Sequence, residues 1–229
     1  MSVLKPYRFY PKAAIERRAT HLLRRMEMQG VNFAPRWPFD TTRVADFLDL
    51  GVVWERIEPD EQGAIAARIL PAYRQIEINE DILDKPQGFQ ESTLAHEIGH
   101  WMLHINHDEA DGVVKQLELD LGVEPQVQPF VCRGSQEEAK RRSQLYWIEW
   151  QAQYFAGCLL MPRYILEDMR QNRDLTRWSH LYDMRDRLGV SISNLVKRLQ
   201  DLGWIYIPKG TRKLRLGRES SEAQMRLLG

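Results

Sequence analysis

The chain has 229 residues, of which 43% are hydrophobic, and its 32 Lys and Arg residues are balanced by 32 Asp and Glu residues. A chain of this length can bury a substantial core, and a prior of roughly 150 residues per domain allows one domain plus an appendage. The balanced charge excludes a global electrostatic attraction to nucleic acid or to an anionic membrane. Nucleic acid or an anionic membrane would therefore have to bind a local patch of basic residues.

The residues 1–14, MSVLKPYRFYPKAA, lack the apolar run of a signal peptide. Nowhere in the chain do about 18 apolar residues follow one another, so no membrane partner is expected. Cys132 and Cys158 are too few for a disulfide framework and form no CxxC pair. These features predict a cytoplasmic protein.

The first half of the chain alternates between helical and strand patterns. Residues 12–30 have apolar residues at helical spacing up to Gly30, and a second helix is expected near residues 41–50. Strand-like sequence begins at residue 51, and residues 63–80 read as two strands around a turn at Pro71. We therefore expect an α+β fold with a small antiparallel sheet.

The residues 92–104, STLAHEIGHWMLH, form a histidine-rich helix in this interpretation. At about 100° per residue, four histidines fall within an arc of ~80°, and apolar residues gather on the opposite side. The four histidines are His96, His100, His104 and His107. This division predicts one buried face and one face that binds a metal.

The spacing HExxH has a known chemical use. Two histidines four residues apart can both reach one Zn²⁺, and the glutamate beside the first can take a proton from a water molecule at the metal. In this chain the residues are His96, Glu97 and His100. A chance match in a polar helix is the alternative, but the amphipathic pattern and Gly99, which lets another element approach closely, favour the metal site.

A third protein ligand is expected, because catalytic zinc usually has three protein ligands and an open position. Residues 145–162, LYWIEWQAQYFAGCLLMP, place Glu149 on a helix face with Ala152, Gln153 and Ala156. The small residues leave space for a partner helix. Spacing alone explains Glu149 equally well as a surface glutamate.

The two segments together resemble the ImmA/IrrE family of metallopeptidases, whose pattern is an AHExGHxxLH helix followed by a helix of the form ExxAxxFAxxLLMP. The resemblance extends from about residue 63 to about residue 203. It implies a gluzincin-type, zincin-like core with a helical bundle, in which His96, His100 and Glu149 bind zinc and Glu97 is the catalytic base. It also implies a zinc endopeptidase, with Mn²⁺ as an alternative metal.

The resemblance further implies a substrate class. Members of this family perform limited proteolysis of a regulatory protein, typically a helix-turn-helix repressor, and so switch on stress or mobile-element genes. Nothing in the composition or spacing of this chain indicates such a protein partner. An extended substrate is expected along residues 73–79, which we predict to be an edge strand of alternating polarity beside the histidine helix; Gln75 and Glu77 lie on its polar side and are candidate contacts.

Three further residues have open roles. Gln153 stands where the family commonly has Asn or Asp, and a longer side chain would make a looser contact with a ligand histidine. His104 is expected to hydrogen-bond within the cleft, to stabilise an oxyanion or to be structural. The thiol of Cys132 could occupy the open coordination position of zinc, but the favoured interpretation is a buried, inert thiol. Residues 108–148 are expected to form an exposed excursion beside the cleft.

The carboxy-terminal sequence predicts a helix, a turn at Gly189, a second helix capped by Ser191, and a hairpin. This is the outline of a winged helix-turn-helix. We therefore divide the chain into a peptidase domain (1–172), a helix-turn-helix-like unit (173–218) and a polar tail (219–229). The residues expected to be exposed for DNA are Asn194, Lys197, Arg198, Lys209, Arg212, Lys213, Arg215 and Arg218.

These residues support a competing function, a DNA-binding regulator in which zinc is structural. The balanced net charge instead favours a helical cap on the peptidase, with a solvated basic tail.

Overall fold

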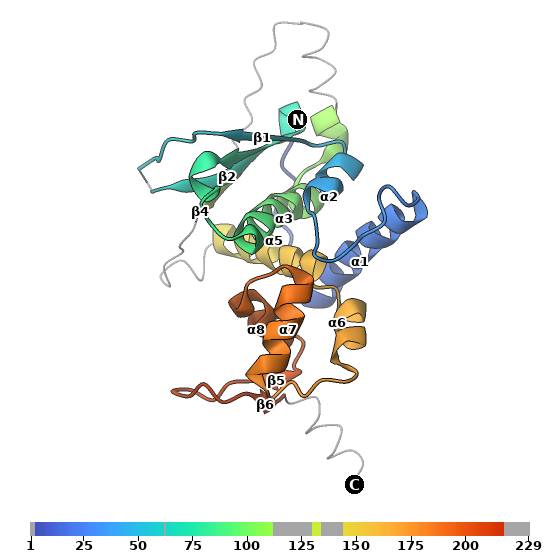
Figure 1. The fold of residues 1–229 in the computed structure, drawn as a ribbon. Helices are drawn as coiled ribbons and strands as arrows, with labels where there is room; N and C mark the ends of the chain where they lie inside the picture. The colour runs from blue at the N-terminus through green and yellow to red at the C-terminus, as the bar shows by residue number, and fades with distance from the viewer. Residues whose placement is uncertain (1–2, 62, 112–129, 134–143, 218–229) are drawn as a thin grey trace, which may run out of the picture.

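The computed structural model describes residues 3–61, 63–111, 130–133 and 144–217, and it has a mixed α+β fold. A small sheet lies on one side of helix α3 (Gln87–His104), and α5 (Gln144–Leu160) crosses on the other side (Figure 1). The remaining carboxy-terminal elements lie beyond α5. No helix in the described ranges is both long enough and apolar enough to span a membrane.

The predicted amino-terminal helices are confirmed. Helix α1 (Lys12–Met28) begins after Pro11, whose missing N–H suits a helix start, and it packs against α5. Its buried residues are the apolar set that the spacing predicted: Ile15, Ala19, Leu22, Leu23 and Met26. The second helix, α2 (Thr42–Phe47), is shorter than expected and leads into the sheet. Helical periodicity therefore located the core-facing side of α1.

The sheet has the strand order β1-β3-β2-β4. Its strands are β1 (Gly51–Glu55), β2 (Ile65–Leu70), β3 (Gln75–Asn79) and β4 (Phe130–Arg133). Strand β2 is antiparallel to both β3 and β4, but β1 runs parallel to β3. The prediction of an antiparallel sheet is therefore wrong for β1, because the chain leaves β1 and passes through β2 before β3 returns alongside β1.

The prediction that residues 73–79 form an edge strand is also wrong. Strand β3 lies between β1 and β2, so its backbone is already paired on both sides. Glu77 is buried and binds Arg68 of β2, while the Gln75 side chain donates to Glu77 at 3.0 Å. The polar side chains of β3 therefore pair with other residues of the sheet. Because β1 and β2 occupy both edges of β3, an extended substrate cannot pair with its backbone at Gln75 and Glu77.

Strand β4 lies in the predicted excursion after the histidine helix, where the sequence indicated no strand. It pairs with β2 at the edge of the described sheet and lies near α3. Residues 112–129 and 134–143 of that excursion lie outside the described residues, as does the Cys132 side chain. The predicted roles of the excursion and of Cys132 stay predictions.

Helix α6 (Arg163–Arg170) is followed by α7 (Trp178–Leu188) and α8 (Ile192–Asp201). Gly189, with a positive φ of 72°, ends α7, and the Ser191 side chain accepts from the Asn194 N–H at the start of α8. A two-stranded sheet of β5 (Ile205–Tyr206) and β6 (Arg215–Leu216) follows. These helix, turn and hairpin positions match the sequence prediction.

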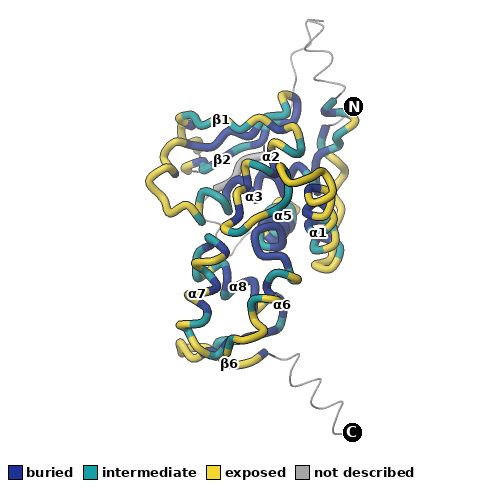
Figure 2. Tube along the Cα trace, turned by 45° about the vertical axis from the view of Figure 1, so that its right-hand side comes forward, coloured by how far each residue is buried: buried dark blue, intermediate teal, exposed yellow. Residues whose placement is uncertain are grey.

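The buried apolar cluster includes side chains from both predicted units, among them Phe155 of α5 and Leu195 and Leu199 of α8. Figure 2 shows the buried residues gathered where α5 lies against α3 and α1, whereas the segment around β6 is largely exposed. The division at residue 172 stays a prediction, and residues 219–229 lie outside the described ranges.

Asn79 stabilises the connection between β1 and β2 through hydrogen bonds of its side chain. Its buried side-chain amide donates to the carbonyl oxygens of Ile57 at 2.9 Å and Ile65 at 2.8 Å, at the two ends of that connection. Its carbonyl oxygen accepts from the Asp81 N–H at 3.1 Å. A single side chain therefore satisfies three backbone groups beside the sheet.

We predict that Asn79→Ala lowers the free energy of unfolding by about 2–3 kcal/mol, because buried carbonyl groups lose their donors. Chemical denaturation measures this change. Asn172→Ala, at an exposed position, is the control and should change stability by less than about 0.5 kcal/mol. Equal effects of the two substitutions would contradict the role of Asn79.

Candidate metal centre

The centre depends on a close approach of α3 and α5. A Cβ atom placed on Gly99 of α3 would lie 2.8 Å from the carbonyl oxygen and 3.0 Å from the Cα of Ala152 on α5. Only a residue without a side chain allows this separation. The predictions that Gly99 admits another element and that Ala152 faces a partner helix are both confirmed.

This approach brings Glu149 of α5 to the two histidines of α3. Glu149 Oε2 lies 3.1 Å from His96 Nε2, and Glu149 Oε1 lies 3.4 Å from His100 Nε2. The two Nε2 atoms are 3.0 Å apart, and the potential ligand atoms of the three residues lie within 4.8 Å of one another. Three donors from two helices therefore converge on one point, as the sequence predicted.

Each histidine also has a contact at its outer ring nitrogen. Gln153 Oε1 lies 3.3 Å from His96 Nδ1, and His104 Nδ1 lies 3.2 Å from His100 Nδ1. An acceptor at Nδ1 places the proton there and leaves the Nε2 lone pair directed toward the centre. The contacts suit the predicted supporting roles of Gln153 and His104, and the buried position of His104 behind His100 favours this role over oxyanion stabilisation.

The charges at the centre suit a cation. Burial alone would raise the pKa of Glu149, but hydrogen bonds with His100 and His96 outweigh burial and hold this pKa below its ordinary value. Burial alone would lower the pKa of His96, whereas its hydrogen bond and charge interaction with Glu149 raise it overall. Burial and the neighbouring His100 lower the pKa of His104 to about 3, which keeps its ring neutral and able to accept.

Glu97 has a different environment from Glu149. It is fully buried, and neither carboxylate oxygen has a hydrogen-bond partner among the described residues. Burial raises the pKa of Glu97 to about 8, with a smaller contribution from the charge of Glu149. A buried carboxyl group without a partner is costly, which is the kind of feature that persists at functional sites.

The prediction that His107 shares the ligand face is wrong. Helix α3 ends at His104, because Ile105 adopts an extended conformation and pairs with Leu4. His107 instead donates from Nε2 to the Trp101 carbonyl oxygen at 2.8 Å. Extrapolating the helix past its end produced the error.

Arg198, which the sequence placed on an exposed DNA-binding face, is buried. Its guanidinium group donates to Glu16 of α1 at 2.6 Å, to the Met161 carbonyl oxygen at 3.1 Å and to the Tyr154 hydroxyl at 3.3 Å. Asn194 lies against α3, with its amide 3.4 Å from Ser92 Oγ. The expectation of exposure is therefore wrong for Arg198, and α8 is attached to the helices that carry the centre.

The sequence did not indicate Glu16 or Tyr154 as structural partners of α8. Glu16 sits among arginines in a pattern that reads as a solvated surface, and Tyr154 sits among apolar residues. Neither position carries a local signal, because their partner Arg198 is 182 residues from Glu16 along the chain.

No protein-family model matches the chain, and no curated protein matches it. Among solved structures it is similar to a Mycobacterium tuberculosis transcriptional regulator, with 14% sequence identity and a TM-score of 0.45 over 83% of this chain and 52% of that chain. The chain thus spans about half the length of that regulator, and a likeness at this level carries no argument about function.

We predict that Gly99→Ala weakens both the fold and metal binding, because the added methyl group must displace the backbone at Ala152. The free energy of unfolding should fall by about 1–3 kcal/mol. Gly157→Ala on α5 is the matched control, since a Cβ there meets no atom of the described ranges within 4 Å. Denaturation and zinc titration of both variants measure these effects, and unchanged zinc affinity in Gly99→Ala would contradict the dependence on this close approach.

Proposed function

We propose that the chain is a zinc-dependent endopeptidase with a zincin-like core of the ImmA/IrrE kind. The observation that carries this proposal is the convergence of His96, His100 and Glu149 within 4.8 Å, beside the buried carboxyl group of Glu97, which has no hydrogen-bond partner in the part of the chain that the structure describes. The motif spacing and the resemblance in sequence agree with it.

The donor set fits zinc. Two imidazoles and one carboxylate are a usual protein set for catalytic zinc, and such a set leaves a coordination position for water or substrate. Each imidazole is oriented through its outer nitrogen, by Gln153 and by His104. Mn²⁺ is the alternative, and it fits less well because it prefers oxygen ligands.

The proposed mechanism assigns the proton transfers to Glu97. A zinc ion held by His96, His100 and Glu149 would supply Lewis-acid activation of a peptide carbonyl and a water molecule. Glu97 then accepts the proton of the attacking water and passes it to the leaving amine. The pKa of about 8 without a cation fits this task, because a neighbouring cation would favour the ionised carboxylate.

For the substrate, we propose a regulatory protein acted on in the cytoplasm, in particular a helix-turn-helix repressor whose limited cleavage releases stress or mobile-element genes. This part rests on the sequence resemblance alone. Co-expression with repressor proteins encoded beside the gene, followed by mass spectrometry of the fragments, tests it: a single defined cut is expected, and intact repressors would contradict it.

The roles at the centre are separable by substitution. Glu97→Gln should keep about one zinc per chain while hydrolysis falls by at least about 10²-fold, since it removes a proton acceptor and not a ligand. Glu149→Ala and His96→Ala should lose the zinc itself. Elemental analysis and a peptidase assay measure both quantities. Glu167→Ala, exposed on α6, is the control; full zinc and activity in Glu149→Ala would show that the third ligand is misassigned.

The alternative function is a DNA-binding regulator in which zinc is structural. The observation that favours it is the exposed basic segment at and before β6, comprising Lys209, Arg212, Lys213 and Arg215. Two observations oppose it: Arg198 is buried, and the amide of half-buried Asn194 already donates to Ser92 Oγ of α3. Arg218 lies outside the described residues.

We expect no tight binding when the wild-type chain is titrated with duplex DNA at two salt concentrations. A protein that neutralises phosphates loses affinity steeply as salt increases, because bound counterions are released. Because we expect no specific DNA contacts from Lys209, Arg212, Lys213 and Arg215, replacing these four residues by Gln should leave the affinity weak and independent of the DNA sequence. Tight, salt-sensitive and sequence-dependent binding would support the regulator and contradict the peptidase as the main function.

A further inference from the structure

Gly157 of α5 occupies an unusual position. Glycine is unfavourable in a helix interior, and Gly99 of α3 is explained by the close backbone of Ala152. Among the described residues, no atom within 4 Å of a Cβ placed on Gly157 explains this glycine in the same way, and its φ is not positive. The missing side chain therefore leaves open space beside α5.

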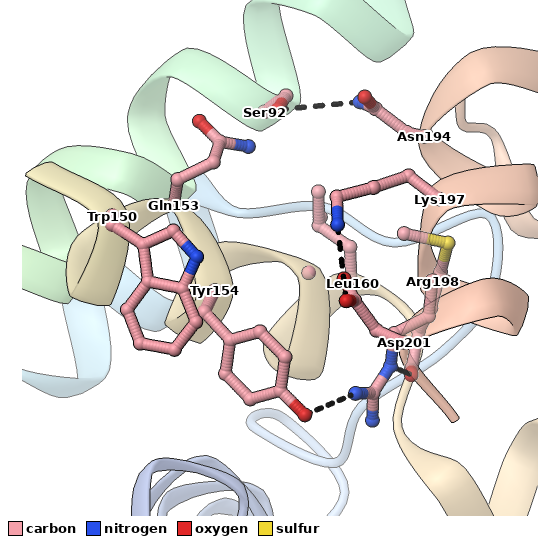
Figure 3. Close-up of a pocket in the computed structure, with 11 residues that line it drawn as sticks. Ser92, Trp150, Gln153, Tyr154, Leu160, Asn194, Lys197, Arg198 and Asp201 are labelled. Carbon is pink, nitrogen blue, oxygen red and sulfur yellow. Dashed lines mark hydrogen bonds and ion pairs between the residues drawn. The ribbon is translucent and has the colours of Figure 1, made fainter. Parts of the chain in front are cut away.

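This space belongs to a pocket of about 90 Å³, enough for several water molecules. Trp150, Tyr154 and Met161 contribute apolar surface to it, together with the bare backbone of Gly157. Figure 3 shows Ser92 and Gln153 on one side of the pocket and the α8 residues on the other. The pocket thus lies between the helices of the metal centre and α8.

The pocket adjoins the metal centre. Gln153 lines the pocket, and its side chain also contacts His96 Nδ1 at 3.3 Å. Ser92, another lining residue, lies one helical turn before His96, about 6 Å along the axis of α3. The pocket thus lies beside His96, on the Nδ1 side of its ring, at a distance that about two residues of an extended polypeptide span.

The charges around the pocket are paired within the protein. Asp201 accepts from Lys197 at 3.0 Å and from Lys12 at 2.7 Å, and Arg198 binds Glu16 at 2.6 Å. A charged ligand would have to compete with these pairs, whereas an apolar group needs only the aromatic and methionine surface. The pairing favours an uncharged occupant.

We propose that this pocket is the subsite that receives one apolar side chain of the polypeptide substrate, of the size of Leu, Met or Phe, and that Gly157 keeps it open. The inference rests on the proposed peptidase function and adds its side-chain specificity. It also gives α8 a role, since Asn194, Lys197 and Asp201 form the far wall of the subsite and not a DNA-reading face.

The test is to fill the pocket from Gly157. The zinc-loaded wild type should cleave a set of blocked peptides with a preference for Leu, Met or Phe at one position next to the cleaved bond. In Gly157→Leu, kcat/KM for these peptides should fall by at least about tenfold, while peptides with Ala at that position change less than about twofold. In Gly157→Ala, kcat/KM for the Leu, Met and Phe peptides should lie between the values of the wild type and of Gly157→Leu. The same substitution should raise Tm by about 1–3 °C, because Ala favours the helix.

Gln200→Leu, exposed on α8 and outside the pocket, is the matched control and should leave the cleavage profile unchanged. Cleavage by the wild type without an apolar preference, or an unchanged profile in folded Gly157→Leu, would overturn the subsite and leave the peptidase proposal standing.

If the wild type cleaves no peptide, the peptidase proposal fails, and a binding measurement on the metal-free chain then decides the pocket. The probes are N-acetylleucinamide and N-acetylalaninamide, followed through the ¹³C-methyl resonance of Met161, which is assigned with Met161→Leu. A shift with the leucine probe that is absent in Gly157→Leu supports an apolar side-chain site. No shift up to the solubility limit of the probe overturns it.

Discussion

The contact between Gly99 and Ala152 is the constraint on which the candidate centre depends. It sets the distance between α3 and α5, and this distance decides whether Glu149 reaches the Nε2 atoms of His96 and His100. Any side chain at position 99 would separate the helices by more than the histidine contacts allow. The geometry of the centre is thus a consequence of backbone packing and not of flexible side chains.

The same packing has an electrostatic consequence. The sheet covers one side of α3 and α5 covers the other, so the polar side chains from Thr93 to His104 are buried together with most of the apolar ones. Glu97 is left in this environment without a partner among the described residues, which costs stability in the folded chain. The catalytic role proposed for Glu97 would account for this cost, and a cation at the adjacent donors would offset part of it.

Periodicity and motif spacing predicted what is local. They located α1, the turn between β2 and β3, the candidate ligands His96 and His100 and the Ser191 cap, whereas the choice of Glu149 needed the resemblance in sequence. Both failed where the environment of a residue depends on partners elsewhere in the chain. Alternating polarity does not distinguish an edge strand from an internal strand such as β3, in which Glu77 pairs with Arg68 of β2. The local sequence of α8 likewise does not show that Arg198 is buried against Glu16. The helical pattern was extended to His107, but α3 ends before that residue because Ile105 pairs with Leu4.

X-ray absorption at the zinc edge of the purified chain tests the central claim most directly. We expect about one zinc per chain, with nitrogen and oxygen ligands at about 2.0–2.2 Å and the scattering pattern of two imidazoles. Loss of this pattern in His100→Ala would assign one imidazole to α3. Sulfur at about 2.3 Å would contradict the proposed ligand set, because it would place a cysteine and not Glu149 at the metal.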